Sequence, residues 1–343
     1  MTRVAAIDCG TNTIRLLIAE ADRDDSGRPR LEVLRRRNEI VRLGQGVDRT
    51  GMLDPEALER TLAAVASYAA DCAELGVAPG GDVRRFVATS ATRDARNRED
   101  FVAGVRRLLG VEPEVVSGQE EARLSFSGSL LGARGAEGAE VQGRAGRVPA
   151  PRLVVDLGGG STELVLGMDE PSVAISLDTG SVRITERFLS SGVTVGAEAA
   201  ARAEVRGLLD DAERVVDLSA PGRLVGLAGT ITTVTAHALG LQAFDPQALG
   251  GAELSPQAVL ASCEAIVHST AEQRASWGYL APGRRDVIAA GALVWSEVVT
   301  RVVERTTAAG RPLARVTTSL YDILDGIALS LVPAQTESEG TEA

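Results

Sequence analysis

The stretches Ile7-Asp8-Cys9-Gly10-Thr11-Asn12-Thr13 and Val155-Asp156-Leu157-Gly158-Gly159-Gly160-Ser161 align with each other without a gap. Each has an apolar run that leads into an Asp, a Gly two residues after that Asp, and then a hydroxyl residue. The alignment continues into a second apolar run, with residues 14–18 over residues 162–166. Two apolar runs joined by a glycine turn indicate a pair of strands. Because the pattern occurs twice, the sequence predicts a duplicated half-molecule.

Such a turn can bind an anion and a metal. Glycine has no Cβ and tolerates positive φ, so neighbouring backbone N–H groups can converge on an anion. The Asp before it can hold a divalent cation or its hydration shell. Two facing turns would therefore bind a phosphate and Mg²⁺, with Asp8 and Asp156 as metal ligands. The alternative is that both are ordinary hairpins with an Asp in the turn. The residues assigned to phosphate binding are Gly10, Thr11, Asn12, Gly158, Gly159, Gly160 and Ser161.

A third glycine turn, Val225-Gly226-Leu227-Ala228-Gly229-Thr230, precedes a predicted helix. Thr230 would be the N-cap of that helix, and a helix N-terminus attracts anions. Gly229 and Thr230 are therefore further candidates for phosphate binding. A Gly-Thr pair before a helix is also common as a plain cap, so this turn is informative mainly because it is the third of its kind.

The composition is that of a globular protein with two domains' worth of chain. Of 343 residues, 44% are hydrophobic and 3% are aromatic, so the core must consist mainly of Val, Leu, Ile and Ala. The longest apolar run, residues 287–295, is shorter than the roughly 20 residues that span a bilayer. No signal segment is recognisable at the start of the chain. We therefore expect a cytoplasmic protein that does not bind membranes.

The charged residues exclude several functions. A net charge of −11 argues against non-specific binding of nucleic acid or anionic lipid. All 36 basic residues are Arg, and without Lys a Walker phosphate loop, a pyridoxal Schiff base and a protein kinase site are excluded. The run Arg35-Arg36-Arg37 is either a solvated strand or turn, or a guide for a polyanion. We expect the cysteines to pack in the core and the two histidines to be ordinary surface or half-buried residues, with no metal-ligand spacing among them; these are Cys9, Cys72, Cys263, His237 and His268.

Strand and helix patterns alternate along the chain and predict an α/β fold. Asp54 and Pro55 have the residue types of an N-cap and a first helical residue. Two segments lack periodicity: residues 132–152, predicted as a flexible loop, and residues 334–343, predicted as a frayed tail. The predicted domain boundaries place residues 1–122 and a returning helix at 318–331 in the first domain, and residues 123–312 in the second.

Further motifs carry a family resemblance. In order, they are Ala6-Ile7-Asp8-Cys9-Gly10-Thr11-Asn12, Ala88-Thr89-Ser90-Ala91-Thr92-Arg93, Ser117-Gly118-Gln119-Glu120-Glu121-Ala122, residues 156–163, Gly180-Ser181-Val182-Arg183 and residues 226–233. Over residues 4–331 the chain resembles the exopolyphosphatase / guanosine pentaphosphate phosphohydrolase family, in its short, two-domain form. The resemblance implies a duplicated actin-like (ribonuclease H-like) α/β fold, shared with sugar kinases, with the active site in the cleft between the domains. The departures are Thr13 in place of Ser, a long segment 132–152, and an unusual sequence at residues 317–320.

The resemblance also implies hydrolysis of a terminal phosphoanhydride with Mg²⁺ or Mn²⁺, and it allows a monovalent cation as a further cofactor. Glu163 would complete the outer shell of a metal held by Asp8 and Asp156. Arg93 offers paired donors to the terminal phosphate, although it could instead form a surface ion pair. Arg183 would line the cleft. A homodimer is implied by the resemblance alone.

The base that activates water is assigned to Glu121, by resemblance and by elimination. Ser117 and Glu120 have the spacing of a capping box, which gives Glu120 a structural role. Glu121 is then freer to face the cleft. The opposite assignment, with Glu120 as the base, remains open at this point.

The leading hypothesis is the release of terminal orthophosphate from inorganic polyphosphate. Removal of the 5′-γ-phosphate of guanosine pentaphosphate needs the same terminal site, and the two activities differ in whether Arg side chains or a base-stacking platform lie further along the channel. The scarcity of aromatic residues favours the former. Two other classes remain: a kinase or chaperone-like ATPase on this fold, and a non-catalytic sensor of polyphosphate or guanosine tetraphosphate. A sensor would leave Asp8, Glu121, Asp156 and Glu163 without a purpose.

Overall fold

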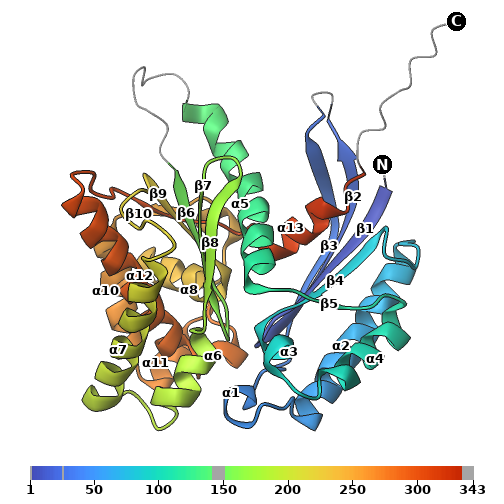
Figure 1. The fold of residues 1–343 in the computed structure, drawn as a ribbon, viewed down its shortest axis with the longest axis horizontal. Helices are drawn as coiled ribbons and strands as arrows, with labels where there is room; N and C mark the ends of the chain where they lie inside the picture. The colour runs from blue at the N-terminus through green and yellow to red at the C-terminus, as the bar shows by residue number, and fades with distance from the viewer. Residues whose placement is uncertain (1, 25–26, 141–150, 334–343) are drawn as a thin grey trace, which may run out of the picture.

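The computed structural model describes residues 2–24, 27–140 and 151–333. Within these residues the chain forms a five-stranded and a six-stranded mixed β-sheet. Figure 1 shows the two sheets in separate halves, with helices α5 and α13 between them. We call the half with the first sheet domain I and the half with the second sheet domain II. The predicted α/β class and the duplicated two-domain arrangement are confirmed.

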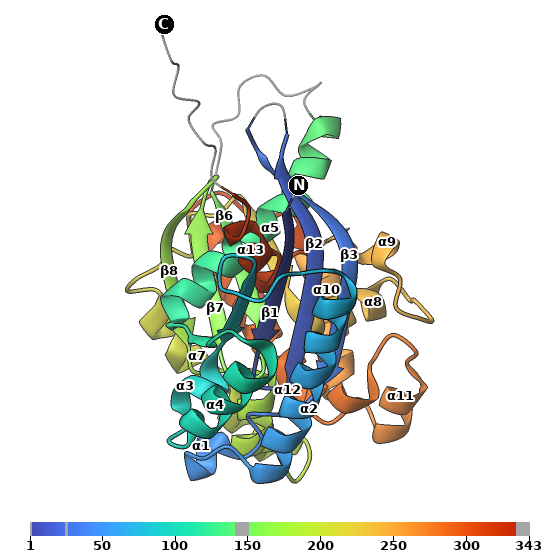
Figure 2. The ribbon, with the colours of Figure 1, turned by 90° about the vertical axis from the view of Figure 1, so that its right-hand side faces the viewer.

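Domain I is built around strands in the order β3-β2-β1-β4-β5. Alternate residues of β1 pack on opposite faces of the sheet: Ala5 and Ile7 face the core formed with α2 and α4, and Ala6 faces α13. Figure 2 shows α2 and α4 in front of this sheet. The elements are β1 (Thr2–Cys9), β2 (Thr13–Arg23), β3 (Pro29–Ile40), α1 (Val47–Thr50), α2 (Pro55–Glu74), β4 (Arg84–Ala88), α3 (Ser90–Asp94), α4 (Arg98–Leu109) and β5 (Glu114–Val115).

Domain II repeats this topology with strands in the order β8-β7-β6-β9-β11 and adds β10 at the edge. Its core is larger and includes the buried Trp295. The elements from the crossing helix onward are α5 (Gly118–Glu140), β6 (Arg152–Leu157), β7 (Thr162–Gly167), β8 (Pro171–Leu177), α6 (Ser181–Ile184), a π-helix (Thr185–Leu189), α7 (Val195–Ala212), β9 (Arg223–Leu227), α8 (Ala228–Ala238), α9 (Pro246–Leu249), β10 (Glu253–Leu254), α10 (Pro256–Val267), α11 (Ala271–Ser276), a 3-10 helix (Pro282–Arg284), α12 (Ile288–Ala308), β11 (Val316–Thr318) and α13 (Ile323–Ser330).

The two halves are joined where α5 and α13 cross. A Cβ on Gly128 of α5 would overlap the carbonyl oxygen of Asp322, and a Cβ on Gly326 of α13 would overlap that of Leu124. Glycine at both positions therefore lets the two helix backbones touch. This crossing holds the domains together on one side of the molecule (Figure 1).

Some predicted boundaries differ from the structure. The predicted loop 132–152 is helical up to Glu140, although Gly132, Gly135 and Gly138 disfavour helix; the Ala and Glu residues between them favour it without an apolar stripe. Residues 141–150 and the predicted tail 334–343 lie outside the described residues. The second sheet extends past the predicted boundary at residue 312, since β11 pairs with β9. A strand of three residues gives too little pattern to be found from sequence.

The described residues contain no helix long and apolar enough to cross a membrane. The three cysteines are buried, as predicted.

Candidate active site between the two domains

The two glycine turns have the same geometry and line one cavity. The N–H of Gly10 donates to the carbonyl of Thr13 at 2.9 Å, and the N–H of Gly158 donates to that of Ser161 at 3.0 Å. The cavity between them measures about 90 Å³. One water needs about 10–15 Å³, so there is room for several waters or a phosphoryl group. The predicted site residues that line it are Asp8, Gly10, Thr11, Asn12, Glu121, Asp156, Gly158, Gly159, Ser161, Glu163, Gly229 and Thr230.

Four carboxylates from different elements meet at this cavity. Asp8 lies near the end of β1, Asp156 near the end of β6, and Glu163 on β7 directly opposite Asp156. Glu121 lies in the first turn of α5. None of the four is more than 8% exposed. The three strands and the N-terminus of α5 thus bring together carboxylates that are up to about half the chain apart in the sequence.

Burial raises the pKa of all four carboxyl groups, because the charged form loses its hydration. It raises the pKa of Asp156 to about 6 and that of Glu121 to about 8, with the neighbouring carboxylates adding to the effect. The pKa of Glu163 is also well above its ordinary value, and that of Asp8 is raised despite attraction by Arg15. In the absence of a bound cation, these groups therefore hold their protons more tightly than ordinary carboxyl groups.

This donor set fits a Mg²⁺ ion. Mg²⁺ binds through one or two carboxylates together with water and phosphate oxygens. Asp8 and Asp156 supply such carboxylates from opposite walls of the cavity. Glu163 is the cross-strand neighbour of Asp156, and the hydroxyl of Ser176 donates a hydrogen bond to its Oε1 at 2.8 Å. The oxygens of Asp156 are further fixed by Ser125, whose hydroxyl donates to Oδ2 at 2.6 Å. A divalent cation would offset the unfavourable burial of these charges.

Arg15 is a site residue that the sequence analysis missed. It lies on β2 directly opposite Asp8, and its Nη2 is 2.6 Å from the Oδ2 of Asp8. Its Nη1 binds the carboxylate of Asp322, which is the N-cap of α13. Burial disfavours the charged guanidinium, but the carboxylates of Asp322 and Asp8 outweigh this effect and raise the pKa of Arg15 further. Arg15 is therefore a permanent cation at the cavity.

Glu121 rather than Glu120 faces the cavity. The hydroxyl of Ser117 accepts a hydrogen bond from the N–H of Glu120 at 3.2 Å, which is one of the two bonds of the predicted capping box, while the Glu120 carboxylate lies 3.6 Å from Arg85. Arg93 is not among the residues that line the cavity. Its Nη1 donates to the carbonyl of Val116 at 2.9 Å and to the Oε2 of Glu121 at 3.3 Å. Arg93 thus contacts the candidate base.

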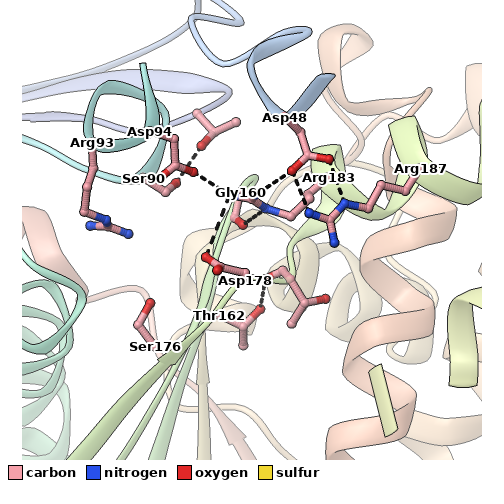
Figure 3. A network of polar contacts seen from close by, with 12 residues as sticks. Asp48, Ser90, Arg93, Asp94, Gly160, Thr162, Ser176, Asp178, Arg183 and Arg187 are labelled. Atoms are coloured by element: carbon pink, nitrogen blue, oxygen red, sulfur yellow. Dashed lines mark hydrogen bonds and ion pairs between the residues drawn. The ribbon is translucent and has the colours of Figure 1, made fainter. Parts of the chain in front are cut away.

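Arg183 and Gly160 also lie beside the cavity rather than in its lining. The Nε of Arg183 donates to the carbonyl oxygen of Gly160 at 2.7 Å. The other nitrogens of this guanidinium bind carboxylates of domain I (Figure 3). The sequence could not predict this, since those carboxylates are brought close only by the contact between the domains.

The third glycine turn also reaches the cavity, although its helix starts earlier than predicted. α8 begins at Ala228, so Thr230 lies inside its first turn and is not the N-cap. Ala228 has φ of 72°, a left-handed conformation that is uncommon for a residue with a Cβ. A Cβ on Gly229 would overlap the guanidinium of Arg284. Burial lowers the pKa of Arg284 to about 10, and within the described residues its side chain has no hydrogen-bonded or ion-paired partner.

The chain is similar in sequence and fold to known proteins. A sequence profile described as the Ppx/GppA phosphatase family matches residues 18–309. The chain belongs to this family. It is 44% identical to Exopolyphosphatase 2 of Mycobacterium tuberculosis over 337 residues, which cover 96% of this chain and 99% of the relative.

Solved structures of Ppx/GppA relatives have the same fold. The crystal structure of an exopolyphosphatase-like protein superposes with a TM-score of 0.84 at 41% identity, covering 96% of this chain and 97% of the other. A Ppx/GppA family member of Aquifex aeolicus superposes with a TM-score of 0.72 at 26% identity, covering 96% and 97%. The family resemblance inferred from the motifs is confirmed.

In this Ppx/GppA chain a wider pocket of about 1190 Å³ lies beside the small cavity. Both have Arg15, Ala228, Gly229 and Arg284 in their linings, so these residues stand where the two spaces adjoin. The wider pocket lies between the β3 edge of domain I and the β10–β11 edge of domain II. Besides Arg15 and Arg284, the cavity residues that the sequence analysis did not select include Ser90 and Ser181. Ser90 belongs to a motif that carried the resemblance, which could have indicated it.

Proposed function

We propose that this protein is an exopolyphosphatase, which hydrolyses the terminal phosphoanhydride of inorganic polyphosphate and releases orthophosphate. The observation that carries the proposal is the meeting of Asp8, Glu121 and Asp156 with two glycine turns in a small cavity that adjoins a wide pocket. The small end has room for one phosphoryl group, and the wide end for the rest of the chain. The relative named Exopolyphosphatase 2 supports the same activity.

In the proposed reaction, backbone N–H groups of the two turns and the guanidinium of Arg284 hold the terminal phosphoryl group. Glu121 accepts a proton from a water molecule, whose oxygen forms the new bond to phosphorus as the bridging oxygen leaves with the shortened chain. Arg93 keeps one oxygen of Glu121 fixed. Mg²⁺ held by Asp8 and Asp156 would neutralise charge on the phosphate oxygens.

The wider pocket supports binding of a polyanion. Arg36 and Arg37 of β3 line it, along with Arg15 and Arg284. The run at residues 35–37 lies on an edge strand, where Arg36 binds Asp325 and Arg37 binds Asp71 and Glu39. Guidance of a polyanion by Arg36 and Arg37 would require a phosphate chain to compete with these carboxylates, and it stays part of the proposal.

A second candidate function is removal of the 5′-γ-phosphate of guanosine pentaphosphate. One observation favours it: Phe244, Tyr279 and Tyr321 all line the wider pocket, although aromatic residues make up only 3% of the chain. Phe244 is 52% exposed and Tyr321 42% exposed, so both present ring surface on which a base could stack.

Phosphate release measured side by side from polyphosphate and from guanosine pentaphosphate tests the proposal. An exopolyphosphatase gives the higher kcat/KM with polyphosphate, and the reverse order favours the second candidate. Binding of either compound with no release would support a sensor, and turnover of ATP alone would support an ATPase. In each assay Glu121→Gln serves as the catalytically impaired control.

The remaining expectations follow from family resemblance and stay part of the proposal: a homodimer in the cytoplasm, activity with Mn²⁺ as well as Mg²⁺, and dependence on a monovalent cation. Sedimentation of the purified protein tests for the homodimer. Activity assays with varied salts test the requirement for divalent and monovalent cations.

A further inference from the structure

Arg183 connects the two domains next to the phosphate cavity. Its Nε donates to the carbonyl of Gly160, in the second glycine turn of domain II, at 2.7 Å. Its Nη2 donates to Asp94 at 2.7 Å, and its Nη1 binds Asp48. Asp48 lies in α1 and Asp94 at the end of α3, both in domain I. Figure 3 shows these contacts together with a longer one of 3.9 Å from Nη2 to Asp178 of domain II.

The helix that carries Arg183 also holds the same turn through its backbone. The N–H groups of Ser181 and Arg183 each donate at 3.1 Å, to the carbonyl oxygens of Gly158 and Gly159 respectively. A Cβ on Gly180 would lie 2.5 Å from the carbonyl oxygen of Gly159, so α6 packs directly against the turn. Movement of α6 would therefore move the turn.

The second glycine turn, in domain II, touches the first glycine turn, in domain I. A Cβ on Gly160 would lie 2.6 Å from the hydroxyl oxygens of Ser90 and Thr11, and a Cβ on Gly159 would lie 3.0 Å from the Cβ of Thr11. Ser90 begins α3, the same helix whose last residue, Asp94, binds Arg183. Helix α3 therefore takes part both in the contact between the two turns, through Ser90, and in the ion pairs of Arg183, through Asp94.

Neighbouring groups strengthen the ion network. Both oxygens of Asp48 accept hydrogen bonds of 2.7 Å from Arg187. Glu186 accepts the N–H of Gly46 at 2.9 Å, which adds another bond between the domains. The side chains of Arg183 and Asp48 are 10% and 18% exposed. Partly buried, multiply bonded pairs contribute more than isolated pairs on the surface.

We propose that Arg183 is a positioning residue: its bonds to Asp48 and Asp94 hold the second glycine turn against the first, so that the phosphate site is complete only when the domains are closed. The crossing of α5 and α13 also connects the domains and lies away from this network (Figure 1). Arg42 of domain I binds Asp286 of domain II at 2.9 Å as a further connection. Breaking the Arg183 network therefore loosens the contact beside the cavity while the crossing still joins the domains. The inference rests on the proposed function, because it assigns a role in binding the terminal phosphate.

Asp48→Asn and Glu213→Gln form a matched pair of variants. Asp48 binds Arg183 and Arg187 across the domains, whereas Glu213 binds Arg301 and Arg305 within domain II at a comparable exposure of 21%. If Asp48 stabilises the closed, binding-competent state, its loss lowers the population of that state and raises KM by roughly tenfold. We expect kcat to change less than twofold, since saturating substrate restores closure. Glu213→Gln should leave both parameters within twofold of wild type.

A double-mutant cycle with Arg183→Ala and small-angle scattering complete the test. The effects of Asp48→Asn and Arg183→Ala on KM should be less than additive. Without ligand, Asp48→Asn should have a larger radius of gyration than wild type. Tripolyphosphate should reduce the difference. A wild-type KM and radius in Asp48→Asn, or an equal rise of KM in Glu213→Gln, overturns the inference. If the wild-type protein hydrolyses no polyphosphate, the radius of gyration without ligand still tests whether the ion network holds the domains closed. A failure of the proposed function can therefore be distinguished from a failure of this inference.

Discussion

Arg15 and Glu163 occupy equivalent positions in the two copies of the duplicated hairpin, each directly opposite an aspartate. Asp8 pairs with Arg15 between β1 and β2, and Asp156 pairs with Glu163 between β6 and β7. The duplication has thus produced one oppositely charged pair and one pair of like charge. One wall of the cavity carries a fixed cation and the other two carboxylates. This difference suits a site that must bind both a phosphate and a metal ion.

Replacing Glu121 by Gln should lower kcat at least about 10³-fold while substrate binding persists, because the amide cannot accept a proton and has nearly the same shape. Phosphate release gives kcat, and calorimetry with polyphosphate gives the affinity. Glu120→Gln is the matched control and should retain its activity within twofold, since that side chain is 39% exposed. Equal losses in both variants would contradict the assignment of the base.

Stability in EDTA should fall as the pH rises from 5 to 8. The folded protein holds protons more tightly than the unfolded chain, because the pKa of Asp156 is raised to about 6 and that of Glu121 to about 8. The stabilisation is complete below the ordinary carboxyl pKa values and is lost as the pH passes these raised values. Mg²⁺ replaces protons and should therefore raise Tm more at pH 8 than at pH 5. A Tm in EDTA that does not vary with pH would contradict the geometry of the site.

Gly229→Ala should weaken substrate binding by displacing Arg284, whose guanidinium occupies the place of the new methyl group. Loss of a charged hydrogen bond costs about 1.5–3 kcal/mol, or roughly 10- to 100-fold in KM. Arg284→Gln should have a similar effect, and the double variant should be no worse than either single one. Additive effects would mean that Gly229 and Arg284 act separately.

Gly326→Ala should destabilise the protein strongly, by about 1–3 kcal/mol or more, because its Cβ would overlap the carbonyl oxygen of Leu124 in α5. Gly207→Ala is the matched control within helix α7, since no atom lies within 4 Å of its Cβ position. That variant should be neutral or stabilised by up to about 1 kcal/mol. Thermal denaturation of both compares the two effects, and a stable Gly326→Ala would show that the helices can separate.

Most of the predicted residues that line the cavity lie within repeated or local patterns. Asp8 and Asp156 are equivalent in the gapless repeat, and Glu121 lies one position beyond a local capping motif. Arg15 is equivalent to Glu163 in the same repeat, but it was not predicted as a site residue because the two side chains have opposite charges. Arg284 is the last residue of a 3-10 helix of only three residues, so no argument from spacing could bring it to Gly229.

The chain's own repeat determined the fold class, the two turns and the type of chemistry, because hairpins and their glycines depend on neighbouring residues. Only the tertiary structure decided which groups face the cavity. Arg93 and Arg183, two guanidinium groups of the same chemistry, contact the candidate base and the partner domain respectively, rather than lining the cavity. Their roles depend on distances between segments far apart in the chain, which arise only when the two domains pack together.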